Sequence, residues 1–129
     1  MADKNDGKDM VWNNYWTQID KKSEYKGEFN KDNKTIIEGL GYIKYEDGSL
    51  YQGFVKNKTM NGKGRMTYAN KMVYQGEWKD GKAHGYGVLS DPTEKSLYEG
   101  EWVDDFQEGQ GVMTWNEGES EYRGEFKKG

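Results

Sequence analysis

The single histidine is the first residue to test for chemistry, because histidine is the side chain most often used in acid–base catalysis and in metal binding. Either task needs a second suitable group within reach, and the chain has one His and no Cys. His84 stands between the turn signal Asp80-Gly81 and Gly85. We therefore predict that His84 packs a turn, that the chain is not an enzyme, and that it holds no metal or cofactor.

Three short motifs are also found in ligand sites, and each has a simpler explanation here. Gly-x-Gly occurs in dinucleotide loops, but neither 62–67 nor 85–90 supplies the third glycine or a following helix. Residues 3–7 resemble a calcium loop, yet their glycine is misplaced and Asn14 occupies the position of the bidentate Glu. The glycosylation-like triplets at Asn33 and Asn57 are expected to be turn residues, since no secretory signal is present.

Composition favours a β protein without a membrane span. The chain has 129 residues, 33% of them hydrophobic and 33% charged, and no run of about 20 apolar residues that could cross a bilayer. Aromatic residues make up 15% of the chain, and the 18 glycines are about twice the usual share, which favours twisted strands and tight turns over helices. We expect a cytoplasmic protein, with association with the cytoskeleton or a membrane left open.

Charge is unevenly distributed along the chain. Residues 51–82 carry 7 Lys or Arg against 2 Asp or Glu, whereas residues 83–129 carry 4 against 11. A basic centre of this kind could bind anionic phospholipid headgroups, although solvated hairpin faces would show the same pattern. The candidate headgroup ligands are Lys56, Lys58, Lys63 and Arg65. The net charge of -4 argues against nucleic-acid binding.

Two motifs recur in phase along most of the chain. Tyr-x-Gly begins at Tyr25, Tyr51, Tyr74, Tyr98 and Tyr122, and Gly-x-Gly begins at Gly39, Gly62, Gly85 and Gly109. Between them lie turn signals such as Asp80-Gly81, so each unit predicts a strand, a tight turn and a second strand. The sequence therefore predicts an all-β fold, an elongated, open and twisted single-layer antiparallel meander of repeated hairpins.

Alternation along the strands sorts the side chains onto two faces. One face carries an aromatic and apolar row, and the other face is mixed and largely polar. Glycines on the apolar face leave space for the rings of neighbouring strands, so a bulky residue there should disrupt the packing. The glycines assigned this structural role are Gly53, Gly62, Gly64, Gly76, Gly85, Gly87, Gly100, Gly109 and Gly111.

The repeated unit Tyr-x-Gly-Glu-(Trp/Phe)-x-x-Gly-x-x-x-Gly-x-Gly, clearest at 74–87 and 98–111, resembles the membrane occupation and recognition nexus (MORN) repeat. Departures from the pattern are local. The second unit has Phe54-Val55 in place of Glu-Trp, the first has an insertion near 31–34, and the fourth lacks Gly at its tight turn, Asp104-Asp105. None of these changes the strand alternation.

The resemblance predicts three segments. Residues 1–10 are expected to be a disordered tail, residues 11–24 a capping strand or degenerate half-repeat, and residues 25–129 an array of about four units and a truncated fifth. The fifth unit, from Tyr122, lacks a Gly-x-Gly strand. Either the chain is cut from a longer one, or its last strand is an open edge through which a homodimer could form.

A single-layer sheet cannot fully cover its apolar face, so we predict an aromatic groove that binds a helix or extended peptide of a partner protein. The acidic C-terminal third favours a basic partner. The resemblance implies a scaffold in cytoskeletal, ciliary or membrane-associated assemblies. Its alternatives are a peripheral module that binds phosphoinositides and a regulatory segment of a larger enzyme such as a lipid kinase. The expected groove residues are Tyr51, Tyr68, Tyr74, Trp78, Tyr98, Trp102 and Trp115.

Overall fold

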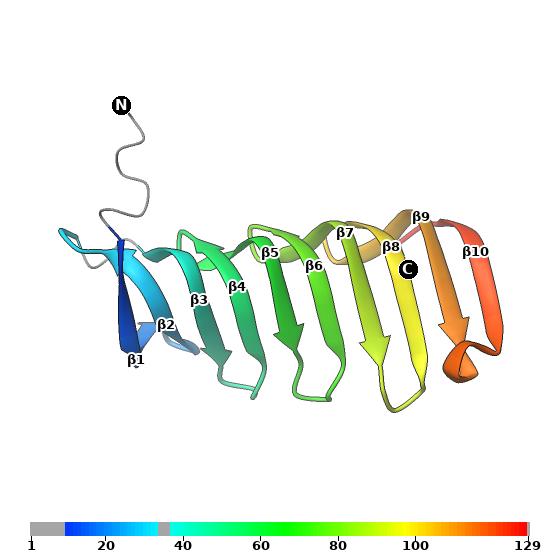
Figure 1. Ribbon diagram of the computed structural model, residues 1–129, viewed down its shortest axis with the longest axis horizontal. Coiled ribbons are helices and arrows are strands. Elements are labelled where there is room, and N and C mark those ends of the chain that lie inside the picture. The colour runs from blue at the N-terminus through cyan, green and yellow to red at the C-terminus, as the bar shows by residue number, and fades with distance from the viewer. Residues whose placement is uncertain (1–9, 34–36, 129) are drawn as a thin grey trace.

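The computed structural model describes residues 10–33 and 37–128, and nearly all of them belong to one antiparallel sheet (Figure 1). The ten strands pair in chain order, each with the strand before it and the strand after it, which confirms the predicted fold class. Their bounds are β1 Met10–Asp20, β2 Ser23–Asn30, β3 Ile37–Tyr45, β4 Leu50–Lys56, β5 Thr59–Thr67, β6 Val73–Lys79, β7 Lys82–Asp91, β8 Ser96–Val103, β9 Phe106–Trp115 and β10 Ser120–Phe126.

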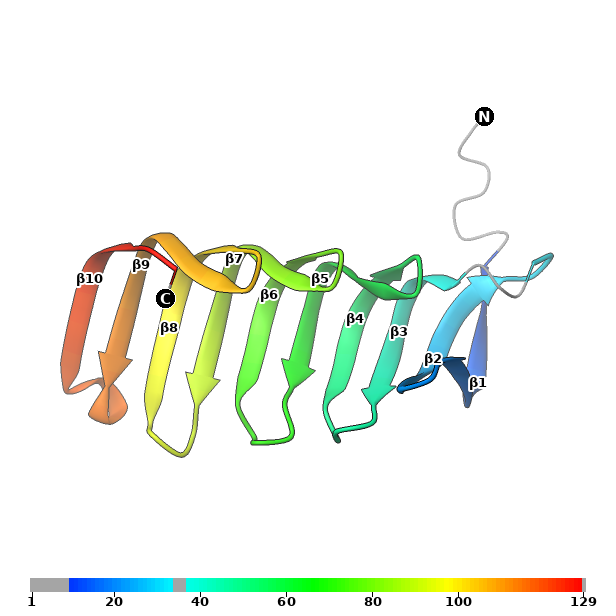
Figure 2. The ribbon, with the colours of Figure 1, turned by 180° about the vertical axis from the view of Figure 1, so that it is seen from behind.

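The sheet forms a row in which β1 and β10 lie at opposite ends, and the view from behind shows no second layer of described elements on either face (Figure 2). From β3 onward the strands are joined alternately by longer loops and by tight two-residue turns. A short 3-10 helix, η2 (Asn116–Gly118), lies in the last of these loops. Since each strand contacts chiefly its two neighbours, the molecule is built as a linear array of hairpins.

The tight turns use left-handed backbone at both central residues, which is the geometry that matches the twist of a hairpin. The φ angles are 47° and 85° at Asp80 and Gly81, and 53° and 62° at Asn57 and Lys58. The fourth unit keeps this turn without glycine, with φ of 47° at Asp104 and 74° at Asp105. Asp tolerates this region better than most residues, so the missing glycine does not change the hairpin.

Each unit bends at a β-bulge next to its tight turn. In β6 the register shifts between Gly76 and Trp78, and the same shift occurs in β2, β4 and β8. A bulge bends its strand and increases the local twist. The part of each hairpin that carries the tight turn therefore folds over one face of the sheet, as the curved upper strand ends in Figures 1 and 2 show.

The core lies on the face over which these turns fold. It is a single cluster that runs along the sheet, and its most completely buried side chains are Ile43, Tyr51, Tyr74 and Tyr98. We call this side of the sheet the aromatic face and the opposite side, which carries residues such as Gln52, Arg65 and Gln75, the polar face.

The N-terminal strand completes one end of the array. Residues 10–20 form β1, which pairs with β2, so the segment predicted at 11–24 contains most of β1, the turn at 21–22 and the first two residues of β2. The tail predicted at residues 1–10 lies outside the described residues except for Met10. The insertion in the first unit, near 31–34, lies between β2 and β3 and is partly outside the described residues.

Candidate functional site

A continuous ladder of rings packs along the aromatic face. Successive rings meet edge to face, with centroids 4.8–5.5 Å apart, in the order Tyr51, Trp78, Tyr74, Trp102, Tyr98, Phe126 and Tyr122. Each Trp or Phe comes from a folded-over end and inserts between the Tyr rings of two neighbouring units. This edge-to-face geometry stabilises aromatic pairs beyond the burial of their area.

Polar atoms of the ladder find backbone partners. The Tyr74 hydroxyl donates to the carbonyl of Glu77 at 2.8 Å, and the same bond recurs three residues after the other repeat tyrosines. The Trp78 and Trp102 Nε1 groups donate to the carbonyls of Gly64 and Gly87 at 3.0 and 3.1 Å. Burial is the main cause that raises the pKa of Tyr74 above its usual value, so this phenol is uncharged at neutral pH.

The aromatic face also carries an open groove of about 540 Å³. Its walls come from the tight turns, at Gly81 and Asp105, and from the long loops at the opposite strand ends, at Asp47 and Asn70. Because both ends of the hairpins line one groove, the aromatic face is concave across the strands. The groove is lined chiefly by methionine and aromatic side chains, namely Met60, Met66, Met72, Tyr45, Tyr68, Tyr74, Trp78 and Trp102.

The predicted groove residues fall into four groups. Tyr74, Trp78 and Trp102 reach the groove but are at most 6% exposed, so they form its floor. Tyr68 is half-buried in its wall. Tyr51 and Tyr98 belong to the buried ladder, and Trp115, 40% exposed at the end of β9, lies outside the lining.

Sequence reasoning missed that the folded-over turns cover most of the ring row, and it missed the methionines. Met60 and Met66 lie on β5, and Met72 lies in the loop before β6. Met72 and Tyr68 are only half-buried and offer accessible apolar surface. The available signal was the clustering of three of the 6 methionines in residues 60–72.

The rim of this groove is acidic. Asp47 and Asp105 are both exposed, and among the described residues that line the groove there is no Lys or Arg. The Ser49 N–H donates to Asp47, and this bond is the main cause that lowers the pKa of Asp47, which keeps the carboxylate ionised. Asp105 accepts a hydrogen bond from the Ala83 N–H at 2.7 Å, which holds its carboxylate in place beside the neighbouring unit.

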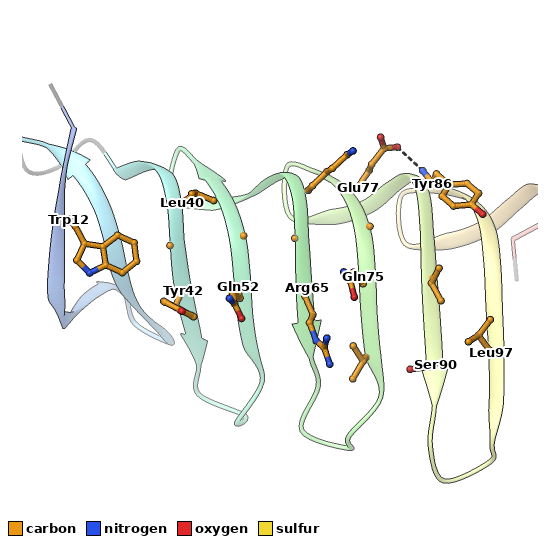
Figure 3. Close-up of a pocket in the computed structure, with 17 residues that line it drawn as sticks. Trp12, Leu40, Tyr42, Gln52, Arg65, Gln75, Glu77, Tyr86, Ser90 and Leu97 are labelled. Atoms are coloured by element: carbon orange, nitrogen blue, oxygen red, sulfur yellow. Dashed lines mark hydrogen bonds between the residues drawn. The ribbon is translucent and has the colours of Figure 1, made fainter. Parts of the chain in front are cut away.

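The polar face carries a larger, longer trough of about 1110 Å³ (Figure 3). Its lining runs from Trp12 on β1 to Leu97 on β8. Figure 3 shows Gln52, Arg65 and Gln75 side by side along neighbouring strands in its middle. The trough therefore presents a polar and basic centre between two more apolar ends.

The structure separates the four candidate headgroup ligands into two that line the trough and two that do not. Lys63 and Arg65 line the trough, with Lys63 opposite Glu77 in the strand register. Lys56 ends β4 and Lys58 lies in the tight turn that follows, and neither lines the trough. The four cations are all exposed, but they do not converge on one pocket.

One cluster on the polar face was not foreseen. The Trp12 and Tyr42 rings meet edge to face at 6.2 Å, the Lys26 Nζ lies over the Trp16 and Tyr42 rings, and the Lys44 Nζ lies 4.4 Å from the Trp16 centroid. Alternation alone could not place Trp12 and Trp16, because the β1 register shifts between Asn13 and Thr17. The Lys26 and Lys44 ammonium groups are therefore already paired with aromatic rings of the same molecule.

Glutamate and glycine residues of the motif hold neighbouring strands together. The Glu77 carboxylate accepts a hydrogen bond from the Tyr86 N–H at 2.7 Å (Figure 3), and Glu28 and Glu101 accept the equivalent bonds from the Leu40 and Gln110 N–H groups. Gly85 supplies the left-handed φ of 103° beside this contact, as Gly109 does beside Glu101, and Gly62 has a φ of 86° beside Phe54 in the second unit. The remaining structural glycines face each other in pairs, namely Gly53 with Gly64, Gly76 with Gly87 and Gly100 with Gly111.

His84 contacts the next turn. Its Nδ1 accepts a long hydrogen bond, 3.4 Å, from the Asp104 N–H, and lies 3.6 Å from the Asp104 carboxylate. The corresponding Asn61 accepts from the Asp80 N–H at 3.1 Å. Within residues 10–33 and 37–128, no group of His, Asp and Glu side chains is arranged to hold a metal ion. In the same part of the chain no helix is long and apolar enough to cross a membrane.

Comparison with known proteins gives a family match over three consecutive units. The family model described as MORN repeat matches residues 51–73, 74–94 and 98–120, together just over half of the chain. These ranges contain the Tyr-x-Gly and Gly-x-Gly motifs of the second, third and fourth units. The first unit, from Tyr25, has the same strand pairing in the structure but lies outside the matched ranges.

Two curated relatives share a stretch of this sequence. Alsin of Homo sapiens is 39% identical over 57 residues, which is 40% of this chain and 3% of Alsin. Alsin of Mus musculus gives the same identity over the same length, covering 4% of that protein. The chain therefore spans only a small fraction of the length of the relatives it matches.

Proposed function

Because the chain belongs to the MORN repeat family, we propose that its aromatic-face groove binds an apolar segment of a partner protein that also carries Lys or Arg. The family is generally non-enzymatic. The observation that carries the proposal is the groove itself, an accessible apolar lining of Met72 and Tyr68 over a rigid floor of buried rings. Methionine and aromatic side chains are typical of surfaces that bind apolar segments.

The dimensions of the groove limit what it can hold. Its lining extends from Tyr45, at the end of β3, to Asp105, in the turn after β8. With about 4.8 Å between strands, this is roughly 24 Å, the length of about seven residues of extended chain. The rings of the floor are buried and closely packed, so their side chains have little conformational entropy left to lose on binding.

The acidic rim supports the basic character of the partner. Asp47 and Asp105 stand on opposite walls of the groove. Cationic side chains that flank an apolar core would meet both carboxylates without entering the apolar floor. Such complementarity raises the association rate and disfavours acidic segments.

The proposal is tested by selecting peptides from a random display library on the folded full chain. Selected sequences should combine two or three large apolar residues with Lys or Arg. Met72→Glu, which places a charge in the groove wall, should weaken their binding at least about tenfold. Lys63→Glu, which also makes the protein more negative but lies in the polar-face trough, should leave it unchanged. Selected peptides whose binding responds to Lys63→Glu and not to Met72→Glu would contradict the proposal.

A second candidate, binding of phosphoinositide membranes, is favoured by the seven basic residues of 51–82. It is tested by co-sedimentation with phosphatidylcholine vesicles with and without phosphatidylinositol bisphosphate. Salt-sensitive binding that is lost in the Lys56→Glu/Lys63→Glu variant would support it. The location in a cytoskeletal, ciliary or membrane-associated assembly, and a role as the regulatory segment of a larger enzyme, stay predictions.

A further inference from the structure

A row of side chains crosses the middle of the polar-face trough, one from each of five neighbouring strands. The strand register places Tyr42 opposite Gln52 and Gln52 opposite Arg65. It continues with Gln75 opposite Arg65 and Val88 opposite Gln75. All five line the trough, and Figure 3 shows the first four following one another from β3 to β6. We call these five residues the central row.

Arg65, at the centre of this row, is an exposed cation without a partner. Its guanidinium makes no hydrogen bond or ion pair with any residue of 10–33 and 37–128. Other cations of the polar face do have one. The Lys44 Nζ lies 3.5 Å from the Glu24 carboxylate. The Arg123 guanidinium lies 3.1 Å from the Glu121 carboxylate.

The hairpin itself does not require a cation at this position. Arg65 directly follows the second glycine of its Gly-x-Gly motif, and the other units have Tyr42, Val88 and Val112 there. An opposite charge on a neighbouring strand would stabilise the sheet, but both neighbours of Arg65 in the row are uncharged glutamines. Arg65 is therefore free to pair with a group outside the chain.

The two glutamines are also free to bind. The Gln52 and Gln75 side chains are exposed and make no hydrogen bond within the described part of the chain. They flank Arg65 at a spacing of about 4.8 Å on each side. A guanidinium fork matches the two oxygens of a carboxylate, and the amides can donate to carbonyl oxygens of a bound backbone.

The charge of the trough limits the anion that it fits. Its charged lining residues are Lys63, Arg65 and Glu77, which leave one net positive charge. Lys63 lies opposite Glu77 in the register, so the uncompensated charge is that of Arg65. A single carboxylate balances this charge. Lipid phosphate groups, each with up to about two negative charges, would exceed it.

Apolar contacts lie at equal distances on both sides of Arg65. Tyr42 and Val88 are each two strands away, and Trp12 and Leu97 extend the lining beyond them. Two strand spacings are about 9.6 Å. A polyproline II segment repeats every three residues and rises about 9.3 Å over that repeat, whereas a β-strand would turn every third side chain to its other face.

We propose that the central row binds an extended segment of a partner protein in polyproline II conformation, with one Asp or Glu midway between two large apolar residues three positions away. Its carboxylate pairs with Arg65, and its apolar side chains contact Tyr42 and Val88. The Gln52 and Gln75 amides donate to its backbone carbonyls, which have no partner within a polyproline II helix. This site lies on the face opposite the aromatic-face groove and does not depend on the function proposed for that groove.

The test uses the fluorescent peptide Leu-Pro-Pro-Glu-Pro-Pro-Leu, titrated onto the full chain while its anisotropy is measured. Saturable binding is expected. The same peptide with Gln in place of Glu should bind at least about tenfold more weakly, since it cannot form the ion pair. The rearranged peptide Pro-Leu-Pro-Glu-Pro-Leu-Pro has the same composition, but its apolar residues are two positions from the Glu, so it should also bind more weakly.

Two protein variants form a matched pair. Arg65→Gln should weaken binding at least about tenfold. Arg123→Gln makes the same change at the corresponding polar-face position of β10, outside the trough, and should leave binding unchanged. Met72→Glu, in the aromatic-face groove, should also leave it unchanged. Because Arg65 is exposed and unpaired, its substitution should not unfold the chain, and circular dichroism verifies this.

Absence of binding, equal binding of either control peptide, or unchanged binding to Arg65→Gln would overturn the proposal. Binding lost in Met72→Glu would place the peptide in the aromatic-face groove and would also overturn it. The same variants are tested on phosphatidylcholine vesicles that contain phosphatidylinositol bisphosphate. Vesicle binding that requires Arg65, in a protein that does not bind the peptide, would assign the central row to a membrane and would overturn the proposal as well.

Discussion

Tyr74 and Tyr98 each fix three parts of the structure at once. The ring covers a glycine of the next strand, the hydroxyl bonds to the carbonyl three residues later, and the ring packs edge to face with one aromatic residue of its own unit and one of the next unit. For Tyr74 these partners are Gly87, Glu77, Trp78 and Trp102. A phenylalanine at this position would lose the hydroxyl bond, and an aliphatic residue would lose the ladder.

Glycine substitutions should depend on whether a strand lies beside the glycine. Gly100→Ala brings a Cβ against the β9 backbone and should lower the free energy of unfolding by about 1–3 kcal/mol. Gly124→Ala, at the same position in the last strand, meets only an exposed Tyr122 ring and should cost less than about 1 kcal/mol. Urea unfolding measures both variants. Equal losses would contradict the steric role of the interior glycines.

Buried tyrosines should make the fold sensitive to alkali. Burial is the main cause that raises the pKa of Tyr45 and Tyr68 to about 12, with smaller effects of nearby carboxylates, against an ordinary value of 10.0. Below pH 10 the folded and unfolded states both keep these protons, so the contribution to stability is complete. Between pH 10 and about 12 the unfolded state loses protons that the folded state retains, so the free energy of unfolding should fall.

Tyrosinate absorbance and urea unfolding across this pH range measure the effect. Tyr68→Phe removes one of the titrating groups and should make the free energy of unfolding fall less steeply above pH 10. A slope identical to that of the parent protein would contradict a buried, neutral Tyr68 phenol.

At the scale of elements, the hairpin is held by its tight turn, its bulge and a glutamate that bonds across to the next strand. Glu77, Glu28 and Glu101 make this bond, whereas the second unit has Phe54 there, with its ring 48% exposed. The second unit, which lacks the glutamate, therefore allows a comparison of how much this side chain contributes to stability.

Glu77→Ala should lower the free energy of unfolding by about 1 kcal/mol, since the Tyr86 N–H loses its carboxylate acceptor. Phe54→Glu should raise it by up to about the same amount, by offering the N–H of Lys63 an equivalent acceptor. Hydrogen exchange at these two amides reports the local effect. A stabilising Glu77→Ala, or a strongly destabilising Phe54→Glu, would contradict the assigned role.

Strand order, turn positions and the side on which most residues lie could be predicted from the sequence, because two motifs in phase fix the register of each unit. The bend could not. Tyr74, Gly76 and Trp78 alternate as in a regular strand, and the register shift that folds Trp78 over Tyr74 leaves no mark in that alternation. The groove was therefore expected on the rings themselves, whereas its accessible apolar surface comes from Met72 and Tyr68.

At the scale of the whole molecule, two separate surfaces follow from one sheet. The folded-over turns make the aromatic face concave and give it an apolar groove with an acidic rim, while the polar face carries Lys63 and Arg65 in its own trough. An apolar, basic segment and an anionic membrane would therefore contact opposite faces. Because units interact mainly with their neighbours, a change on one face of one unit should leave distant units intact.

The methionines allow the most direct test of the groove, since Met60, Met66 and Met72 line it while Met10 lies on β1 at the far end of the sheet. The measurement is the nuclear magnetic resonance spectrum of methyl-labelled methionine during titration with a peptide selected on the folded chain. The account predicts that the Met60, Met66 and Met72 methyl signals shift together while the Met10 signal stays in place. Saturable binding that leaves these three signals unmoved would contradict it.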